Sequence, residues 1–217
     1  MSSPFICSLL SVVLILCHTA GTSADDPSAG LFRSEYHRLD LSFCNASVCV
    51  DFDGDGSREL LFASRATGRL EMLHAADGRV IRSQPLDGAQ QSLSAHDVDG
   101  DGDFEIFYTV SGPGRLYQLD HTGRLLGQWE AGDWKLGHSP VVLDADGDGQ
   151  LDGLLGTRSR SLVRLNMTDL SLITRRDGWV QCGCHTSAMD VDRDGLWDLF
   201  AGSGDDSNGK GVLHRYD

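Results

Sequence analysis

Short apolar runs recur along the chain and alternate with polar positions, which is the periodicity of β-strands. The clearest alternation lies in residues 68–73, 114–119, 161–165 and 211–216. Turn dipeptides, Asp77-Gly78 and Thr122-Gly123, precede further strand-like segments at 79–82 and 124–127. No stretch after the first 24 residues shows the 3.6-residue periodicity of an amphipathic helix. The pattern therefore predicts an all-β protein built from short antiparallel strands.

An acidic nine-residue loop occurs four times between these strands. The loops begin at Asp51, Asp97, Asp144 and Asp190, so their starts are 46, 47 and 46 residues apart. Each loop has an acid at positions 1, 3, 5 and 9 and a glycine at position 6. A period of this length with four strands per repeat is typical of β-propeller blades. We expect a β-propeller of four-stranded antiparallel blades, with four blades recognised in residues 43–217.

Two arrangements of the blades fit the sequence. The fourth repeat ends at Asp217 before a fourth strand, while residues 25–42 precede the first repeat and belong to none. Segment 25–42 could supply the missing strand of the last blade and close a four-bladed ring, which would remove the exposed sheet edges. Alternatively, the four blades are part of a larger propeller. The sequence favours neither arrangement.

The first 24 residues are typical of a secretory signal peptide. Residues 5–17 are uncharged, and a small polar stretch follows up to Ala24. Two Asn-x-Ser/Thr triplets, at Asn45 and Asn166, are candidate N-glycosylation sites. We therefore expect a secreted, extracellular glycoprotein with no transmembrane span after cleavage of the leader, although a retained leader would act as an anchor.

Four cysteines remain after such a cleavage, and an oxidising compartment would favour disulfides between them. One possibility is a bond between the first and last blades, which would latch a closed ring. The other is a local bond within the first pair. The candidates are Cys44, Cys49, Cys182 and Cys184.

The charge balance indicates a cation as partner. The chain of 217 residues has 32 acidic and 18 basic side chains, a net charge of −14. This surplus of carboxylates excludes nucleic acid as the expected partner, because neutralising phosphates requires clustered Lys and Arg.

The repeated loops supply the ligands that a calcium ion prefers. Carboxylates at positions 1, 3, 5 and 9, with the backbone carbonyl of position 7, would form an all-oxygen shell. Zinc is disfavoured because nitrogen and sulfur ligands are missing, and magnesium because it requires near-ideal octahedral geometry. EF-hands are excluded because position 12 carries no acid. We expect up to four Ca²⁺ at Asp51, Asp53, Asp55, Ser57, Glu59; Asp97, Asp99, Asp101, Asp103, Glu105; Asp144, Asp146, Asp148, Gln150, Asp152; and Asp190, Asp192, Asp194, Leu196, Asp198.

The loops and their flanking strands resemble FG-GAP/VCBS-type repeats, best known from the β-propeller of integrin alpha subunits. The resemblance covers residues 44–216 and implies calcium bound by the same loop positions. The Phe-Gly and Gly-Ala-Pro segments of integrins are missing, so the chain is similar to the broader VCBS-like group. Arg193 stands at position 4 of the last loop, where the other loops have glycine.

Motifs for catalysis are missing from the sequence: it has no nucleophile elbow, zincin motif, phosphate loop or dinucleotide fingerprint. His96, His138 (followed by Ser139) and His185 lie near the loops, and we interpret them as hydrogen-bonded structural residues. Trp134 and Trp179 are interpreted as packing between blades rather than as a sugar-binding platform. We do not expect an enzyme.

The sequence thus predicts an extracellular calcium-binding β-propeller that acts as a protein- or glycan-binding or adhesion module. The alternative is a propeller domain of a polysaccharide-active lyase or hydrolase, which VCBS-like propellers also resemble, or a fragment of a larger cell-surface propeller protein. The ligand itself is not specified by the residues, because fold does not dictate function.

Overall fold

The computed structural model describes residues 44–64, 67–88, 90–112, 114–132, 136, 138–178, 186–195, 197–205 and 210–216. These residues form fifteen β-strands and no helix, so the predicted all-β class is confirmed. In particular, none of the described segments is a helix long and apolar enough to span a bilayer.

The strands form four antiparallel sheets in chain order, which we call blades 1 to 4. Within a blade, each strand pairs with the next one along the chain, as expected for a propeller blade. Blade 1 contains β1 (Cys44–Val50), β2 (Glu59–Ser64), β3 (Arg69–His74) and β4 (Val80–Pro85). Blade 2 contains β5 (Gln90–His96), β6 (Glu105–Ser111), β7 (Gly114–Leu119) and β8 (Leu125–Glu130).

The second half of the chain repeats this arrangement. In the described residues blade 4 has three strands rather than four, in agreement with the short fourth repeat. Blade 3 contains β9 (Val141–Leu143), β10 (Asp152–Gly156), β11 (Ser161–Asn166) and β12 (Leu172–Asp177). Blade 4 contains β13 (Thr186–Met189), β14 (Asp198–Asp205) and β15 (Lys210–Tyr216).

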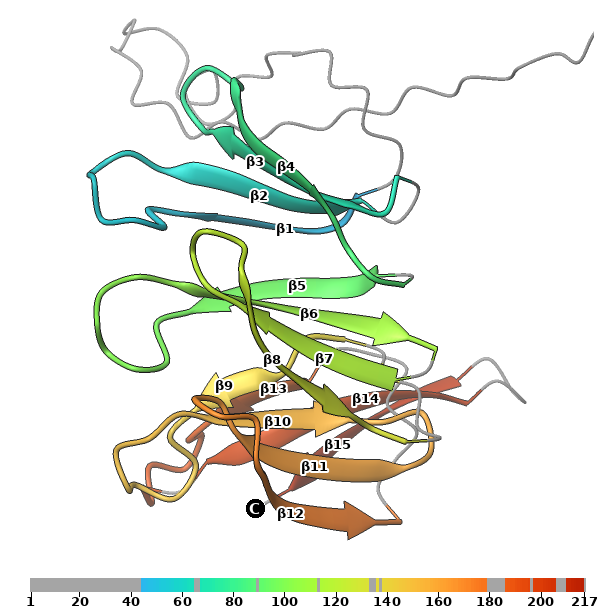
Figure 1. Ribbon diagram of the computed structural model, residues 1–217. Helices are drawn as coiled ribbons and strands as arrows, with labels where there is room; N and C mark the ends of the chain where they lie inside the picture. The colour runs from blue at the N-terminus through green and yellow to red at the C-terminus, as the bar shows by residue number, and fades with distance from the viewer. Residues whose placement is uncertain are drawn as a thin grey trace, which may run out of the picture.

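Blades 1 and 2 pack face to face and share a hydrophobic core, and so do blades 2 and 3 (Figure 1). Leu61 and Met72 of blade 1 are buried in one cluster with Tyr108 and Tyr117 of blade 2. Phe107, on the opposite face of blade 2, is buried together with Val163 of blade 3. Burial of this apolar surface between sheets supplies the main stabilisation of such a fold. A single blade could not bury both of its faces.

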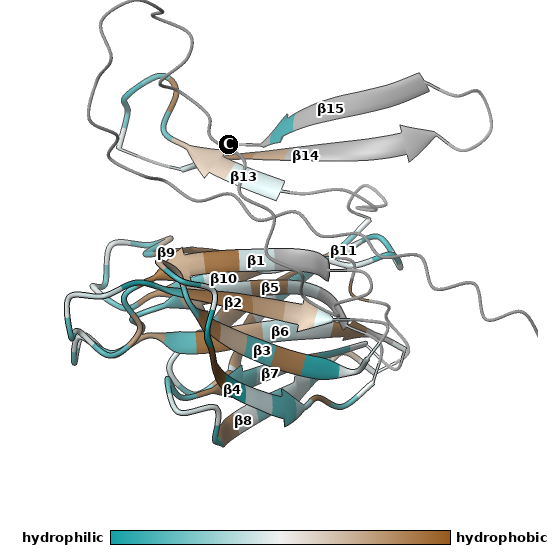
Figure 2. Ribbon diagram, turned by 90° about the horizontal axis from the view of Figure 1, so that it is seen from above, coloured by the Kyte–Doolittle hydropathy of each residue, from teal (hydrophilic) through white to brown (hydrophobic). Residues whose placement is uncertain are grey.

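The innermost strands line up from blade to blade. Strand β1 lies beside β5, and β9 lies beside β13. The outermost strands of blades 1 to 3 leave apolar side chains exposed where they begin, among them Val80, Leu125 and Leu172. Figure 2 shows hydrophobic positions along the strands of the blades, whereas the loops at one end of the blades are mostly hydrophilic. The alternating pattern of the sequence therefore corresponds to the two faces of each sheet.

Several predicted features lie outside the described residues. They include the signal peptide (1–24), the proposed closing segment (25–42), Cys182, Cys184, His185, Trp134, Trp179 and Leu196.

Candidate metal centre

The four acidic loops connect the first and second strands of their blades and lie at the same end of the sheets (Figure 1). We name them loop 1 (residues 51–59), loop 2 (97–105), loop 3 (144–152) and loop 4 (190–198). Each loop leads directly into a strand, and the final acid is the first residue of that strand. This placement agrees with the exclusion of an EF-hand, whose loop leads into a helix.

The acid at position 1 shapes each loop. Its carboxylate accepts a hydrogen bond from the backbone N–H of the glycine at position 6, for example from Gly56 to Asp51 at 2.9 Å. The same bond occurs in loops 2, 3 and 4 at 3.1, 2.9 and 3.1 Å. The glycines at position 6 have φ values between 86° and 97°, a region that side chains with a Cβ disfavour. The glycine of the repeat is therefore required by the turn.

Position 4 of each loop also has a positive φ. Gly54, Gly100 and Gly147 adopt φ values of 69°, 78° and 77°, and Arg193 adopts 63° in loop 4. A non-glycine residue in this left-handed region is strained. The structure thus places Arg193 on the same backbone path as the glycines that it replaces.

The acid at position 9 closes each loop from the protein interior. Its carboxylate accepts a hydrogen bond from the backbone N–H of position 2, at 3.0 to 3.1 Å in all four loops. These acids are Glu59, Glu105, Asp152 and Asp198, and each is at most 5% exposed. Buried carboxylates are costly unless a positive charge or several donors compensate them. A cation beside each of these acids would compensate this cost.

The apolar residue at position 2 packs the first two loops against the hydrophobic cores. Phe52 is buried in the core shared by blades 1 and 2, and its ring packs edge-on against Phe104, with the ring centroids 6.2 Å apart. Val98 is buried against blade 3, where its carbonyl oxygen accepts a hydrogen bond from Thr168 at 3.3 Å. The first two loops are thereby held in defined positions relative to the adjacent blades.

Carboxylate oxygens converge in every loop. One oxygen from each of three acids lies within 4.8 Å of the others, as a shared cation requires. The three acids come from positions 1, 3 and 9 or from positions 1, 3 and 5. The groups are Asp51, Asp53 and Glu59; Asp97, Asp99 and Asp101; Asp144, Asp146 and Asp152; and Asp190, Asp192 and Asp194.

The carboxylate at position 5 and the backbone carbonyl of position 7 were both predicted to be calcium ligands. The carboxylates of Asp55, Asp101 and Asp148 each accept a hydrogen bond from the N–H of position 7, at 2.7, 2.9 and 2.8 Å. This bond orients the backbone of Ser57, Asp103 and Gln150. Asp103 Oδ2 also pairs with the Nδ1 of His121 at 3.1 Å.

Loops 1 and 2 concentrate negative charge, and the exposed Arg58 of loop 1 forms no ion pair with the acids of its loop in the described part of the chain. Burial raises the pKa of Glu59 above its ordinary value, and repulsion by Asp51, Asp53 and Asp55 adds to this effect against the hydrogen bond from Phe52. Glu105 in loop 2 has a raised pKa for the same reasons. In the described part of the chain, no basic side chain is paired with an acid at position 1, 3, 5 or 9 of these two loops.

Loops 3 and 4 differ, because an arginine of the same blade enters each of them. Arg164 Nη2 lies 2.6 Å from Asp146 and 2.7 Å from Asp152. Arg215 Nη2 lies 2.6 Å from Asp192, and its Nε lies 2.5 Å from Asp198. Neither arginine was predicted as a site residue from the sequence, although both lie in segments predicted as alternating strands, 161–165 and 211–216.

The histidines near the loops have different surroundings. His96 ends β5, as predicted for an inner-strand residue, and its ring lies 6.2 Å from that of Phe107. Nε2 of His96 is buried and has no hydrogen-bond partner among the residues that the structure describes, so the predicted hydrogen bond is not found there. Burial lowers the pKa of His96, so the ring is held neutral. His138 and Ser139 are half-buried.

The predicted modification sites are described only in part. Asn166 ends β11, and its Nδ2 donates a hydrogen bond to Gln150 Oε1 at 2.8 Å. Cys49 is exposed on β1, while the side chains of Cys44 and Asn45 lie outside the described part. Glycosylation and disulfide pairing therefore stay predictions.

Residues 97–155, which include loops 2 and 3, match the family described as FG-GAP-like repeat. No curated protein sequence matches the chain. Among solved structures, BBS1N in complex with ARL6DN, soaked with mercury, has a TM-score of 0.61 and 12% identity, with coverage of 81% of this chain and 51% of that chain. The hydrazine synthase of Kuenenia stuttgartiensis has a TM-score of 0.61 and 9% identity, with coverage of 87% and 49%.

A third similar structure is the dihydro-heme d1 dehydrogenase NirN in complex with DHE, with a TM-score of 0.53, 17% identity and coverage of 73% and 33%. The chain thus spans about half the length, or less, of the solved structures that it matches. At these identities the likeness concerns the fold alone. Together with the repeated blades and the family match, it identifies the chain as a β-propeller protein with an FG-GAP-like repeat over residues 97–155.

Proposed function

We propose that this chain is an extracellular binding module whose blades are held by calcium ions. The observation that carries the proposal is the convergence of carboxylate oxygens, within 4.8 Å of one another, in loops at one end of the blades. Oxygen ligands in a flexible, highly charged loop suit calcium better than magnesium or zinc.

Loops 1 and 2 fit such an ion best. In loop 1, Asp51, Asp53 and Glu59 would hold it, and Asp97, Asp99 and Asp101 would do so in loop 2. A bound calcium ion would supply the positive charge that compensates these carboxylates. Because Glu59 and Glu105 are also bonded to the backbone of Phe52 and Val98, an ion there would tie the loop to the core of its blade.

A role in binding rather than catalysis is supported by two observations. The sequence carries no recognised catalytic motif. One similar structure, BBS1N, was crystallised in complex with another protein, ARL6DN. β-Propellers present loops from several blades on one end, which is a suitable surface for a macromolecular ligand. The signal-like residues 1–24 support placing this surface outside the cell.

Two measurements test the proposal. Isothermal titration of the full chain with CaCl₂ is expected to show binding, with MgCl₂ binding at least tenfold more weakly. The labelled chain is then applied to an array of recombinant extracellular proteins and glycans, in millimolar calcium and in EDTA. Specific binding that is lost in EDTA supports the module, whereas turnover of an array glycan would favour an enzyme. A chain that binds no calcium would contradict the proposal.

A further inference from the structure

We propose that loops 3 and 4 use an arginine in place of a metal ion, so that the calcium of this protein is confined to loops 1 and 2. The inference rests on the proposed function, because it assigns calcium to particular loops. The four loops look alike in sequence, since each carries an acid at positions 1, 3, 5 and 9, although position 9 is glutamate in loops 1 and 2 and aspartate in loops 3 and 4. They differ in what the neighbouring strand brings to them.

In loop 3 the guanidinium of Arg164 bridges the acids that an ion would share. Its Nη2 contacts Asp146 Oδ2 at position 3 and Asp152 Oδ2 at position 9, at 2.6 and 2.7 Å. Both acids belong to the trio whose oxygens converge. Asp152 is 2% exposed, and the Arg164 side chain is largely buried. One positive group therefore already sits between two of the three candidate ligands.

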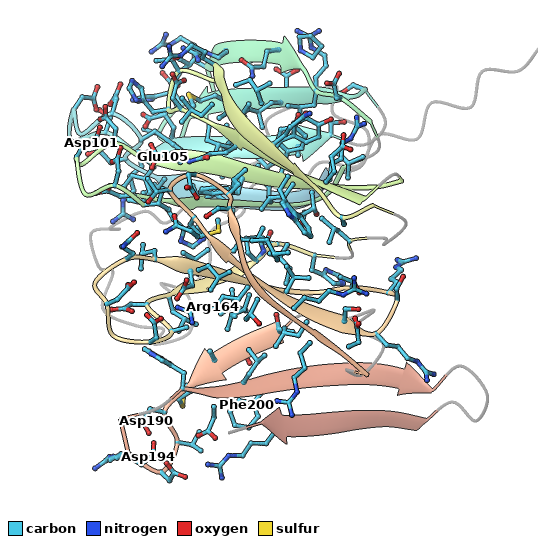
Figure 3. All side chains as sticks on the ribbon, turned by 60° about the horizontal axis from the view of Figure 1, so that its bottom comes forward. Asp101, Glu105, Arg164, Asp190, Asp194 and Phe200 are labelled. Carbon is cyan, nitrogen blue, oxygen red and sulfur yellow. The ribbon has the colours of Figure 1, made fainter. Side chains whose placement is uncertain are left out.

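Loop 4 also receives an arginine, which contacts one acid of its converging trio and the buried acid at position 9. Arg215 contacts Asp192 at position 3 through Nη2 and Asp198 at position 9 through Nε. Asp198 is again buried, while Asp192 is exposed. Figure 3 shows Arg164, Asp190 and Asp194 at the same end of the blades as Asp101 and Glu105 of loop 2.

Strand register identifies the position of this arginine in its blade and the equivalent residue in the other blades. Arg164 is paired with Leu154 and Arg215 with Phe200, which both stand two residues after the position 9 acid. The equivalent pairs are Leu61 with Met72 in blade 1 and Phe107 with Gln118 in blade 2. The four blades thus present methionine, glutamine, arginine and arginine at one structural position.

The side chains at this position in blades 1 and 2 cannot replace a cation. Met72 is buried in the core between blades 1 and 2. Gln118 is also buried, and its Nε2 donates to the carbonyl oxygen of Met167 in blade 3 at 3.4 Å. Neither carries a charge, so the acids of loops 1 and 2 depend on a cation from solution.

A guanidinium and a calcium ion cannot share loop 3 or loop 4. Two positive charges within hydrogen-bonding distance of one carboxylate repel each other strongly in a partly buried site. For calcium to bind, Arg164 would have to leave Asp152, and its charge would still lie close by. A bidentate or bridging arginine is also a geometrically good partner for carboxylates. The arginine is therefore the resident cation of these loops.

The stoichiometry of calcium binding tests the inference. Native mass spectrometry and calorimetry of the full chain are expected to count two calcium ions. Removal of the arginines in R164Q and R215Q, singly and together, is expected to raise the count by one per substitution. Circular dichroism checks that each variant is folded, since the buried Asp152 and Asp198 lose their partners.

A matched pair of variants avoids this folding risk. Asp53 and Asp146 both stand at position 3, and both are exposed. D53N is expected to lose one calcium ion, whereas D146N is expected to retain both. Four ions on the unmodified chain, or the loss of an ion in D146N, would overturn the inference and leave the proposed function standing. A chain that binds no calcium, with or without the arginines, would refute the proposed function and this inference together.

Discussion

Arg164 Nη2 lies 2.7 Å from Oδ2 of the buried Asp152, and both residues belong to adjacent strands of blade 3. The same relationship recurs between Arg215 and Asp198 in blade 4. Hydrogen bonding to Asp152 and Asp146 raises the pKa of Arg164 further above its already high ordinary value, so the pair is charged at any physiological pH. Each pair fixes the second strand of its blade to the third.

Removing this arginine is expected to destabilise the chain when calcium is absent. R164Q leaves Asp152 buried without its counter-charge, and the loss of one partner of a buried ion pair costs about 3 kcal/mol in free energy of unfolding. Urea unfolding in EDTA measures the difference. The exposed turn residue Arg158 provides the control, and R158Q should change stability by less than about 0.5 kcal/mol. Equal stability of R164Q and the unmodified chain would contradict the prediction.

Gly153 on β10 cannot be replaced by a larger residue without rearrangement. A Cβ at this position would meet Met167 Sδ at 2.2 Å and Pro140 Cβ at 3.3 Å. G153A is therefore expected to lower the free energy of unfolding by about 2 kcal/mol through overpacking. G112A is the control, since nothing lies within 4 Å of its added Cβ. Thermal unfolding of G153A and G112A in the same buffer measures the difference in melting temperature. Similar melting temperatures would contradict the prediction and show that Met167 and Pro140 move to accommodate the added methyl group.

Asp120 gives the turn between β7 and β8 a defined pH dependence. Partial desolvation would raise its pKa, but hydrogen bonds from Thr122 and from the N–H and Nε of Arg124, at 2.6, 2.9 and 3.0 Å, lower it below the ordinary value. A carboxylate with a depressed pKa stabilises the fold above its unfolded-state pKa of about 4 and loses this contribution as the pH falls through its folded-state pKa.

D120N is accordingly expected to cost about 2 kcal/mol at pH 7 and progressively less below pH 4. Chemical unfolding of both proteins in EDTA across this range gives the difference. T122V, which removes one of the bonds to Asp120, should show a smaller loss over the same pH window. A difference that does not change with pH would mean that the turn depends on shape rather than on charge.

Removal of calcium should lower the melting temperature. Free calcium at ten times its dissociation constant stabilises the fold by about 1.4 kcal/mol per site, so two sites correspond to a shift of about 8 °C for a chain of this size. Differential scanning calorimetry with and without EDTA measures this shift. The double variant D53N/D99N should melt at the same temperature in both conditions, and a calcium-dependent shift in that variant would place the ions elsewhere.

Much of the fold follows from local sequence. The third strand of each blade was predicted because apolar and polar residues alternate with a period of two, and the fourth strands of blades 1 and 2 were predicted from the turns Asp77-Gly78 and Thr122-Gly123. The loops were predicted because their acids and glycines lie within nine consecutive residues. Hydrogen bonds such as that from Gly56 to Asp51 span five residues, so they are already specified by the spacing.

Other features depend on residues that are distant in the chain. Asp192 and Arg215 are 23 residues apart, and they meet because the antiparallel register of β14 and β15 pairs Phe200 with Arg215. A comparison of the repeats by residue count would not have aligned these positions, because Met72 and Gln118 stand 21 residues after the first acid of their loops, whereas Arg164 stands 20 and Arg215 25 residues after it. The strand register shows that all four occupy one structural position. The sequence by itself determined the strands, the repeat and the acidic loops, because these result from local spacing. The tertiary structure decided which loops contain an arginine, because strand pairing brings charges together across a sheet.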